Sequence, residues 1–149
     1  MRDRMQWHTR FLDMAKLVAS WSKDPSTQAG AVIVRKDSTI CSTGYNGFPQ
    51  RMGDDPLLYA DREKKYSRIV HAEMNALLFA RERVTGYWLY TYPFSCCERC
   101  AVHMIQAGID RFIFPEIPDD KKERWGESFA KTKAYLHECG LRYTAIPMA

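Results

Sequence analysis

The chain has 149 residues, of which 46% are hydrophobic and 27% are charged, and its formal net charge is +4. This balance excludes an intrinsically disordered chain and predicts one compact domain over residues 1–149. Acidic residues alternate with basic ones, as in the run Asp119–Arg124, so there is no sustained positive field and we expect no nucleic-acid partner.

The chain starts with Met1–Arg4, which leads into an amphipathic stretch and not into an apolar leader. No apolar run approaches the length of a membrane-spanning helix. We therefore expect a cytoplasmic protein with no membrane partner.

The first half of the chain predicts one helix and one hairpin. A helix over residues 5–22 is indicated by apolar residues at helical spacing, namely Trp7, Phe11, Met14, Ala15, Val18 and Trp21. The Asp24-Pro25-Ser26 stretch ends it. Residues 29–34 and 39–44 read as antiparallel strands joined by a short turn. Residues 44–62, which are rich in Gly, Pro and Asp, are expected to be a loop.

The second half of the chain alternates helices with strands. Its pattern predicts helices over residues 68–83, 97–107 and 119–138, and strands over residues 87–92, 111–114 and 141–146. Alternation at this spacing favours a three-layer α/β/α domain with helices on both faces of a sheet of about five strands. Because the first two strands form a hairpin, the sheet should be mixed.

Cysteine usage points to metal or redox chemistry. The five cysteines are Cys41, Cys96, Cys97, Cys100 and Cys139, an odd number with three of them inside five positions. A disulfide framework in a secreted protein would be spread more evenly and is usually even in number. A Cys-x-x-Cys in an intracellular chain is more typical of a metal site or a redox pair.

Two segments together supply the groups of a catalytic zinc site: Val70-His71-Ala72-Glu73 and Pro93-Phe94-Ser95-Cys96-Cys97-Glu98-Arg99-Cys100. Cys97 and Cys100 are three residues apart at the start of an expected helix, where thiolates are favoured. With His71 as the third ligand, one position of a tetrahedral Zn²⁺ stays open for water. Glu73 would be the general base. A His-x-Glu followed by Pro-Cys-x-x-Cys is typical of zinc nucleobase deaminases.

Cys96 stands where that pattern has proline, so it is a competing ligand candidate. We favour Cys97, because only Cys97 and Cys100 have the spacing that lets two thiolates chelate one metal. A thiol redox pair is one alternative. Another is a closed structural zinc site with His103 as fourth ligand, although His103 also suits a half-buried helix face.

The other histidines and cysteines have no partner pattern. We expect His8 and His137 at the surface. Cys41 and Cys139 are expected to be small buried hydrophobes and not ligands.

Three further stretches carry a family resemblance: residues 21–34, the Gly-Tyr-Asn-Gly-Phe-Pro sequence at 44–49, and Val70-His71-Ala72-Glu73-Met74-Asn75-Ala76. With the cysteine motif, they make the chain resemble the cytidine and deoxycytidylate deaminase family from about residue 6 to residue 114. The resemblance implies hydrolytic deamination of dCMP to dUMP and ammonia, in which a zinc-bound hydroxide attacks C4 and Glu73 carries the proton to N3 and then to the leaving amine.

The resemblance also implies a homo-oligomer with dCTP or dTTP as effectors, for which residues 44–49 are the expected contact. Residues 50–70 contain neither Cys nor His, so we expect one zinc ion per chain.

Substrate contacts are less sharply defined by the sequence. The family resemblance places Asn46 on the sugar, although Asn-Gly is also a strong turn signal. Ser22 and Lys23 are candidates for the phosphate, and helix C-terminal capping is their alternative role. Trp125 and the aromatic stretch 90–94 would stack a base or serve as core or lid residues.

Rival functions also stay open at this point. They are deamination of cytosine, guanine or a tRNA adenosine, and a zinc-stabilised binding module without turnover. A tRNA enzyme would be expected to have a basic surface, and a purely structural site has no use for Glu73.

Overall fold

The computed structural model describes residues 4–147, so Met1–Asp3 of the N-terminal stretch discussed above lies outside the described residues. Along the chain the elements are α1 (Arg4–Ala19), β1 (Gly30–Val34), β2 (Ile40–Tyr45), α2 (Pro56–Ala60), α3 (Arg62–Arg68), α4 (Ala72–Leu78), β3 (Trp88–Tyr92), α5 (Glu98–Ala107), β4 (Arg111–Pro115), α6 (Asp119–Glu138) and β5 (Arg142–Ile146). Within residues 4–147, no helix combines the length and the apolar character that a membrane span requires.

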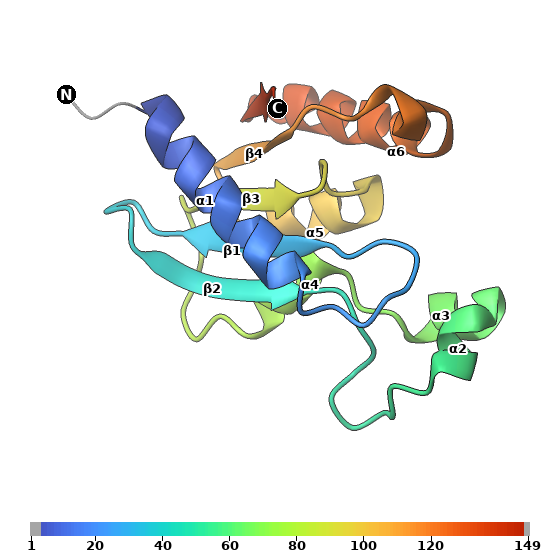
Figure 1. Ribbon diagram of the computed structural model, residues 1–149. Coiled ribbons are helices and arrows are strands. Elements are labelled where there is room, and N and C mark those ends of the chain that lie inside the picture. Colours follow the sequence, from blue (N-terminus) through green and yellow to red (C-terminus); the bar gives the residue numbers. More distant parts are fainter. Residues whose placement is uncertain (1–3, 148–149) are drawn as a thin grey trace.

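The strands form one five-stranded sheet in the order β2-β1-β3-β4-β5 (Figure 1). β1 pairs antiparallel with both β2 and β3, whereas β3, β4 and β5 run parallel to one another. The mixed sheet predicted from the sequence is confirmed. The parallel strands require helical crossovers between them, and α5 and α6 supply these.

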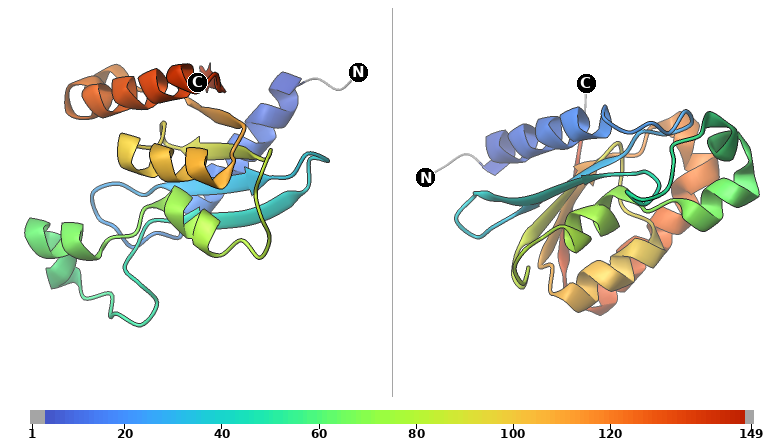
Figure 2. Two further views of the ribbon diagram at one scale, coloured as in Figure 1. Left: turned by 180° about the vertical axis from the view of Figure 1, so that it is seen from behind. Right: turned by 90° about the horizontal axis from the view of Figure 1, so that it is seen from below.

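Helices cover both faces of the sheet, as the sequence predicts. Figure 2 shows α1 on one face and α4, α5 and α6 on the other. Successive side chains along a strand point to opposite faces. Val32 and Tyr90 accordingly pack with α1, while Ala31 and Leu89 pack into the core beneath α4 and α5. The result is a three-layer α/β/α domain with two cores.

Two glycines let a helix approach the sheet closely on each face. A Cβ at Gly30 of β1 would lie 2.1 Å from the carbonyl oxygen of Ala15 in α1. On the other face, a Cβ at Gly44 of β2 would lie 2.3 Å from the backbone nitrogen of Ala76 in α4. These contacts are with backbone and cannot be relieved by a side-chain rotation, so both positions require glycine.

The segment between β2 and β3 differs from the prediction. The expected loop 44–62 contains α2, whose start is marked by Asp55 as N-cap and proline at the first helical position. The expected helix 68–83 is instead a short α4, because Val70 pairs with Gly47 through two backbone hydrogen bonds and holds the chain extended. The residues before this bridge form α3.

Candidate active site

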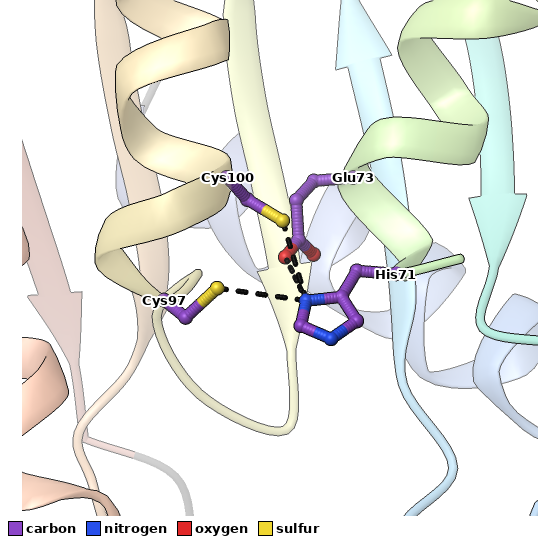
Figure 3. A group of neighbouring side chains, drawn as sticks. All are labelled: His71, Glu73, Cys97 and Cys100. Carbon is purple, nitrogen blue, oxygen red and sulfur yellow. Dashed lines mark hydrogen bonds and ion pairs between the residues drawn. The ribbon is translucent and has the colours of Figure 1, made fainter. Parts of the chain in front are cut away.

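Four side chains converge at one end of the sheet, between α4 and α5. Figure 3 shows His71 and Glu73 coming from α4, and Cys97 and Cys100 from the start of α5. The Nδ1 atom of His71 lies 3.5 Å from Sγ of Cys97 and 3.3 Å from Sγ of Cys100. It also lies 3.9 Å from Oε1 of Glu73. One ligand atom from each of the four residues falls within 4.8 Å of the others.

Helix starts determine where these side chains stand. His71 is the N-cap residue of α4 and Cys97 is the N-cap residue of α5, and neither cap position has a side-chain hydrogen bond to the helix. The side chains of His71 and Cys97 are therefore not used as helix caps and can contact each other. Glu73 and Cys100 follow inside the first turns. The free N–H groups of two helix starts surround the cluster and favour negative charge on its thiols.

The cluster concentrates titratable groups in a half-buried site. The Cys100 thiol hydrogen-bonds to Cys97, which lowers the pKa of Cys97 and raises that of Cys100. Hydrogen bonding to Cys97 raises the pKa of His71 to about 9. Burial raises the pKa of the Glu73 carboxyl, whose side chain is only 8% exposed. A carboxyl group with a raised pKa can both accept and return a proton near neutral pH.

The geometry fits a tetrahedral metal ion. In a zinc site with bonds of about 2.0–2.3 Å, neighbouring ligand atoms are about 3.5 Å apart. The imidazole-to-sulfur separations of 3.3 and 3.5 Å are close to this value. Two sulfurs and one imidazole nitrogen make a three-ligand set, which leaves a fourth position open as in catalytic zinc sites.

The remaining candidates for this metal lie elsewhere. Cys96 is buried in the core beneath α5, and its backbone carbonyl accepts a hydrogen bond from Thr132 of α6. His103 is exposed, and its Nδ1 atom lies 2.7 Å from the backbone carbonyl oxygen of Arg99. A closed site with His103 as the fourth ligand is therefore not formed. The prediction that Cys139 is buried is wrong, because Cys139 is exposed at the end of α6.

A cavity opens directly in front of the cluster. Its inner wall is formed by His71, Glu73 and Cys97. An aromatic wall follows, in which the ring centroid of Phe94 lies 5.7 Å from that of Trp125 and 4.9 Å from that of Phe129. Another part of the cavity lining is polar and includes residues of the loop between α1 and β1. The cavity thus combines an apolar surface for a flat ring with polar groups around it.

Asn46 lines the polar wall, but its side chain also holds the wall together. Its amide nitrogen donates to the backbone carbonyl of Thr27 at 2.9 Å and to Asp24 at 3.2 Å. Its amide oxygen accepts from the backbone nitrogen of Ala29 at 2.9 Å. The sugar contact of Asn46 stays a prediction, and the structure adds a positioning role for this residue.

Ser22 and Lys23 do not line the cavity. The buried Ser22 hydroxyl donates to the backbone carbonyl of Asn46 at 2.8 Å. Lys23 is exposed and forms an ion pair with Asp54 at 3.1 Å. Their proposed contact with a phosphate stays a prediction without a cavity position to support it.

Sequence reasoning missed three residues that the structure places on the cavity wall: Lys65 and Tyr66 of α3, and Arg124 of α6. Arg124 belongs to the mixed-charge run Asp119–Arg124, for which the sequence predicted no nucleic-acid partner. A local signal was available for Lys65 and Tyr66, because the N-cap residues Asp55 and Asp61 predict the short helices α2 and α3 in place of a loop. No local signal places the start of α6 at the cavity.

Comparisons with known proteins agree with this site. Residues 5–116 match the family model described as the cytidine and deoxycytidylate deaminase zinc-binding region. The chain is 41% identical over 145 residues to an uncharacterized deaminase in the luxG 3′ region of Aliivibrio fischeri, which covers 96% of this chain and 95% of that protein. It is 39% identical over 118 residues to deoxycytidylate deaminase of Homo sapiens, covering 75% of this chain and 66% of that protein.

Among solved structures, the chain resembles dCMP deaminase from the cyanophage S-TIM5 in complex with dCMP and dUMP. The TM-score is 0.71 at 19% identity, and the match covers 98% of this chain and 99% of that chain. At this level of identity the match shows that the two chains share a fold.

The fold and the cluster together define a class of protein, the zinc-dependent hydrolases that deaminate bases. Three ligands with an open position beside a buried carboxylate are what that chemistry requires. The chain belongs to the cytidine and deoxycytidylate deaminase family.

Proposed function

We propose that the chain, acting as a single domain, deaminates dCMP hydrolytically to dUMP and ammonia. The observation that carries this proposal is the buried carboxylate of Glu73 in the cluster, 3.9 Å from Nδ1 of His71. In the His-x-Glu pattern this carboxylate transfers protons and is not a metal ligand. A structural metal site would not require a buried carboxylate at this place. The names of curated relatives, among them human deoxycytidylate deaminase, support dCMP as the substrate.

The metal ligands in this proposal are His71 through Nδ1, and Cys97 and Cys100 through sulfur. Bound zinc would supply an acidified water as nucleophile and thereby permit hydrolysis at neutral pH. The thiols release their protons when the metal binds, because only thiolates are good ligands.

Glu73 moves the protons. Its carboxylate takes the proton of the attacking water, and the acid so formed donates that proton to N3 of the cytosine ring. Glu73 next takes the proton of the oxygen now bonded to C4 and passes it to the amine. The C4–N bond then breaks, which releases ammonia and leaves a carbonyl group at C4. Burial raises the pKa of Glu73 and makes the protonated form accessible for this transfer.

The cavity walls orient the base. Phe94 and Trp125 offer an apolar surface on which a pyrimidine ring can lie, while water is excluded from that side. Thr91 and Ser95 are buried on the wall near the cluster. The Thr91 hydroxyl is held by the backbone carbonyl of Phe94 at 2.9 Å, which fixes the loop that carries the aromatic wall.

The test compares the zinc-loaded wild type with Glu73→Gln and, as a matched control, Glu127→Gln on the exposed face of α6. Ammonia release and the ultraviolet change on dCMP measure turnover, and elemental analysis measures zinc. We expect Glu73→Gln to keep one zinc per chain and to lose about 10²- to 10⁴-fold in kcat, the range for a missing general base. Glu127→Gln should match the wild type.

Two results would overturn the proposal in different ways. If zinc-loaded wild type leaves dCMP unchanged with and without dCTP, dCMP is not the substrate, and other cytosine and purine compounds are tested next. If dCMP is deaminated equally well by Glu73→Gln, the proton-transfer role is wrong although the activity stands.

A further inference from the structure

The carboxylate of Asp24 joins three segments of the cavity wall. Its Oδ1 atom accepts hydrogen bonds from the backbone nitrogens of Ser26 at 2.8 Å and Thr27 at 3.3 Å, so the loop between α1 and β1 folds around it. Its Oδ2 atom accepts from the side chain of Asn46, just after β2, at 3.2 Å. Lys65 brings in α3, because its Nζ atom donates to Oδ1 at 2.8 Å. All five residues line the cavity.

The ion pair of Asp24 and Lys65 is shielded from water. The two side chains are 4% and 12% exposed, whereas the neighbouring Lys64 is 58% exposed and lies 3.9 Å from the carboxylate of Asp61. An ion pair away from water is screened less and interacts more strongly than one at the surface. Removal of one partner leaves the other charge covered and unpaired, so this contact should strongly favour the position in which it forms.

Lys65 supplies the contact that fixes the middle of α3. None of the seven residues of α3 is buried or belongs to either apolar core of the domain. Figures 1 and 2 show α2 and α3 beyond the end of the sheet and not over one of its faces. The chain is anchored before α3 by the stacked rings of Phe48 and Tyr59, and after it by the backbone bridge between Gly47 and Val70. Between these anchors, the ion pair ties α3 to the opposite wall.

We propose that Asp24 and Lys65 are positioning residues, whose ion pair holds α3 against the loop between α1 and β1 and so keeps the cavity in the shape that binds substrate. This inference rests on the proposed function, because it assumes that the cavity in front of Glu73 binds a cytosine nucleotide. Tyr66 and Ile69 follow Lys65 along the chain and line the same cavity, so a displaced α3 changes the cavity wall. When fewer molecules have the binding-competent wall, the apparent Kd rises in proportion.

Direct contact between Lys65 and the substrate is the alternative, and the two roles predict opposite results for one variant. Asp24→Asn removes the charge of the partner and keeps an oxygen for the backbone N–H groups of the loop. If Lys65 bound an anionic part of the substrate, Asp24→Asn would free its charge and tighten binding. If Lys65 positions α3, Asp24→Asn weakens binding, because the ion pair is lost.

The experiment compares wild type, Lys65→Met, Lys65→Arg, Asp24→Asn and the double variant of Asp24→Asn with Lys65→Met, all loaded with zinc. Lys64→Met is the matched control, because Lys64 is the preceding lysine of α3, is exposed and does not line the cavity. Turnover of dCMP gives kcat and KM, and calorimetry gives the Kd for dUMP. Limited trypsin digestion reports on α3 itself, since Lys65→Met and Lys64→Met each remove one of its cleavage sites.

We expect Lys65→Met to raise the KM for dCMP and the Kd for dUMP by about 10- to 100-fold, the usual loss for a hydrogen bond to a charged group. The kcat should change by less than about threefold, because saturating substrate restores the closed wall. Trypsin should cut within α3 about tenfold faster than in Lys64→Met, because an unfastened helix opens more often.

The other variants test the pair as a unit. Lys65→Arg should recover most of the affinity for dUMP, because it keeps the charge. Asp24→Asn should weaken dUMP binding, and the double variant should lose little more than Lys65→Met alone, since both changes remove the same interaction. Should Lys65→Met not fold, Asp24→Asn carries the test.

The inference fails if Asp24→Asn binds dUMP more tightly than wild type, which would make Lys65 a direct ligand. It also fails if Lys65→Met and Lys64→Met agree in their Kd for dUMP and in their rate of cleavage by trypsin. Failure of the proposed function is distinguishable, because zinc-loaded wild type would then leave dCMP unchanged, while the trypsin digestion would still show whether Lys65 holds α3.

Discussion

His8 and His71 belong to layers on opposite faces of one sheet, and their surroundings shift their pKa values in opposite directions. His8 of α1 is buried beside Tyr90, with its Nδ1 atom 2.8 Å from the phenol oxygen. Burial, and then the charges of Arg111 and Arg4, lower the pKa of His8 to about 4. Contact with Cys97 raises the pKa of His71 to about 9.

The contrast teaches that the neighbours of an imidazole decide its role. The α1 face surrounds its histidine with aromatic rings and guanidinium groups, which keep it neutral and make it a packing residue. The α4 face surrounds its histidine with thiols and a carboxylate, which favour a positive charge at that point. A site that attracts a proton so strongly also attracts a metal cation once the thiols are ionised.

The sharpest way to test this comparison is to remove each imidazole in turn. His71→Ala leaves only two zinc ligands, so we expect zinc content to fall well below one per chain and deamination of dCMP to fall by about 10³-fold or more. His8→Gln keeps a polar side chain beside Tyr90 and should keep full zinc content. Elemental analysis and ammonia release measure both. Zinc loss in a folded His8→Gln variant would show that the two faces are not independent.

The close backbone contacts at Gly30 and Gly44 allow the two faces of the sheet to be compared in a second way. Gly30→Ala would place a Cβ 2.1 Å from the carbonyl oxygen of Ala15, and Gly44→Ala would place one 2.3 Å from the backbone nitrogen of Ala76. We expect each to lower the free energy of unfolding by about 3 kcal/mol, the upper part of the range for overpacking. Urea denaturation measures this loss.

Zinc affinity should separate these two variants. Gly44→Ala displaces α4, whose N-cap is His71, so its zinc affinity should fall in a competition assay with a chelator. Gly30→Ala displaces only α1, on the opposite face, and should bind zinc as the wild type does. Equal zinc affinity in both variants would mean that the site tolerates movement of α4.

The two faces of the sheet also differ in how much of their structure could be predicted from the sequence. The alternation of apolar residues predicted the strands and the charged helix α6, whose bounds 119–138 agree with the structure. Two short motifs selected the four clustered residues. Helix spacing places Cys97 and Cys100 on one face, whereas His71 and Glu73 were selected by their match to the zinc deaminase pattern. On the α1 face, His8 was predicted at the surface and is instead buried.

That error has a physical cause. His8 is buried by Tyr90, which is 82 positions away in the sequence, and no local pattern records such a contact. Arg124 is the same kind of case, because its place with Tyr66 on the cavity wall depends on how two distant helices pack. By contrast, α2 and α3 were missed although their aspartate caps are local signals.

The buried His8 gives the α1 face a dependence on pH. Its pKa is lowered from 6.5 to about 4 on folding, so the unfolded chain binds more protons between these values. Stability is then complete above pH 6.5 and is lost as the pH falls towards 4. Between pH 7 and pH 5 the contribution falls by about 2 kcal/mol.

Urea titrations of metal-free wild type and His8→Gln measure this contribution of His8 to the free energy of unfolding. The difference in unfolding free energy between the two proteins should shrink by about 2 kcal/mol from pH 7 to pH 5. The metal site is identical in both proteins, so its own titration cancels. A difference that stays constant with pH would mean that His8 titrates normally and that the contrast with His71 is wrong.

A third glycine gives the smallest effect and the opposite sign. Gly126 lies inside α6, and a Cβ there would meet only the Cβ of Lys122, at 4.0 Å. Glycine inside a helix destabilises it relative to alanine by about 0.5–1 kcal/mol. Gly126→Ala should therefore raise the unfolding free energy by about that amount, measured by urea denaturation, and leave the KM for dCMP unchanged. A stabilised variant with a raised KM would instead mean that the cavity needs a flexible α6 next to Arg124 and Trp125, and glycine at this position would then serve the site, as it does at Gly44.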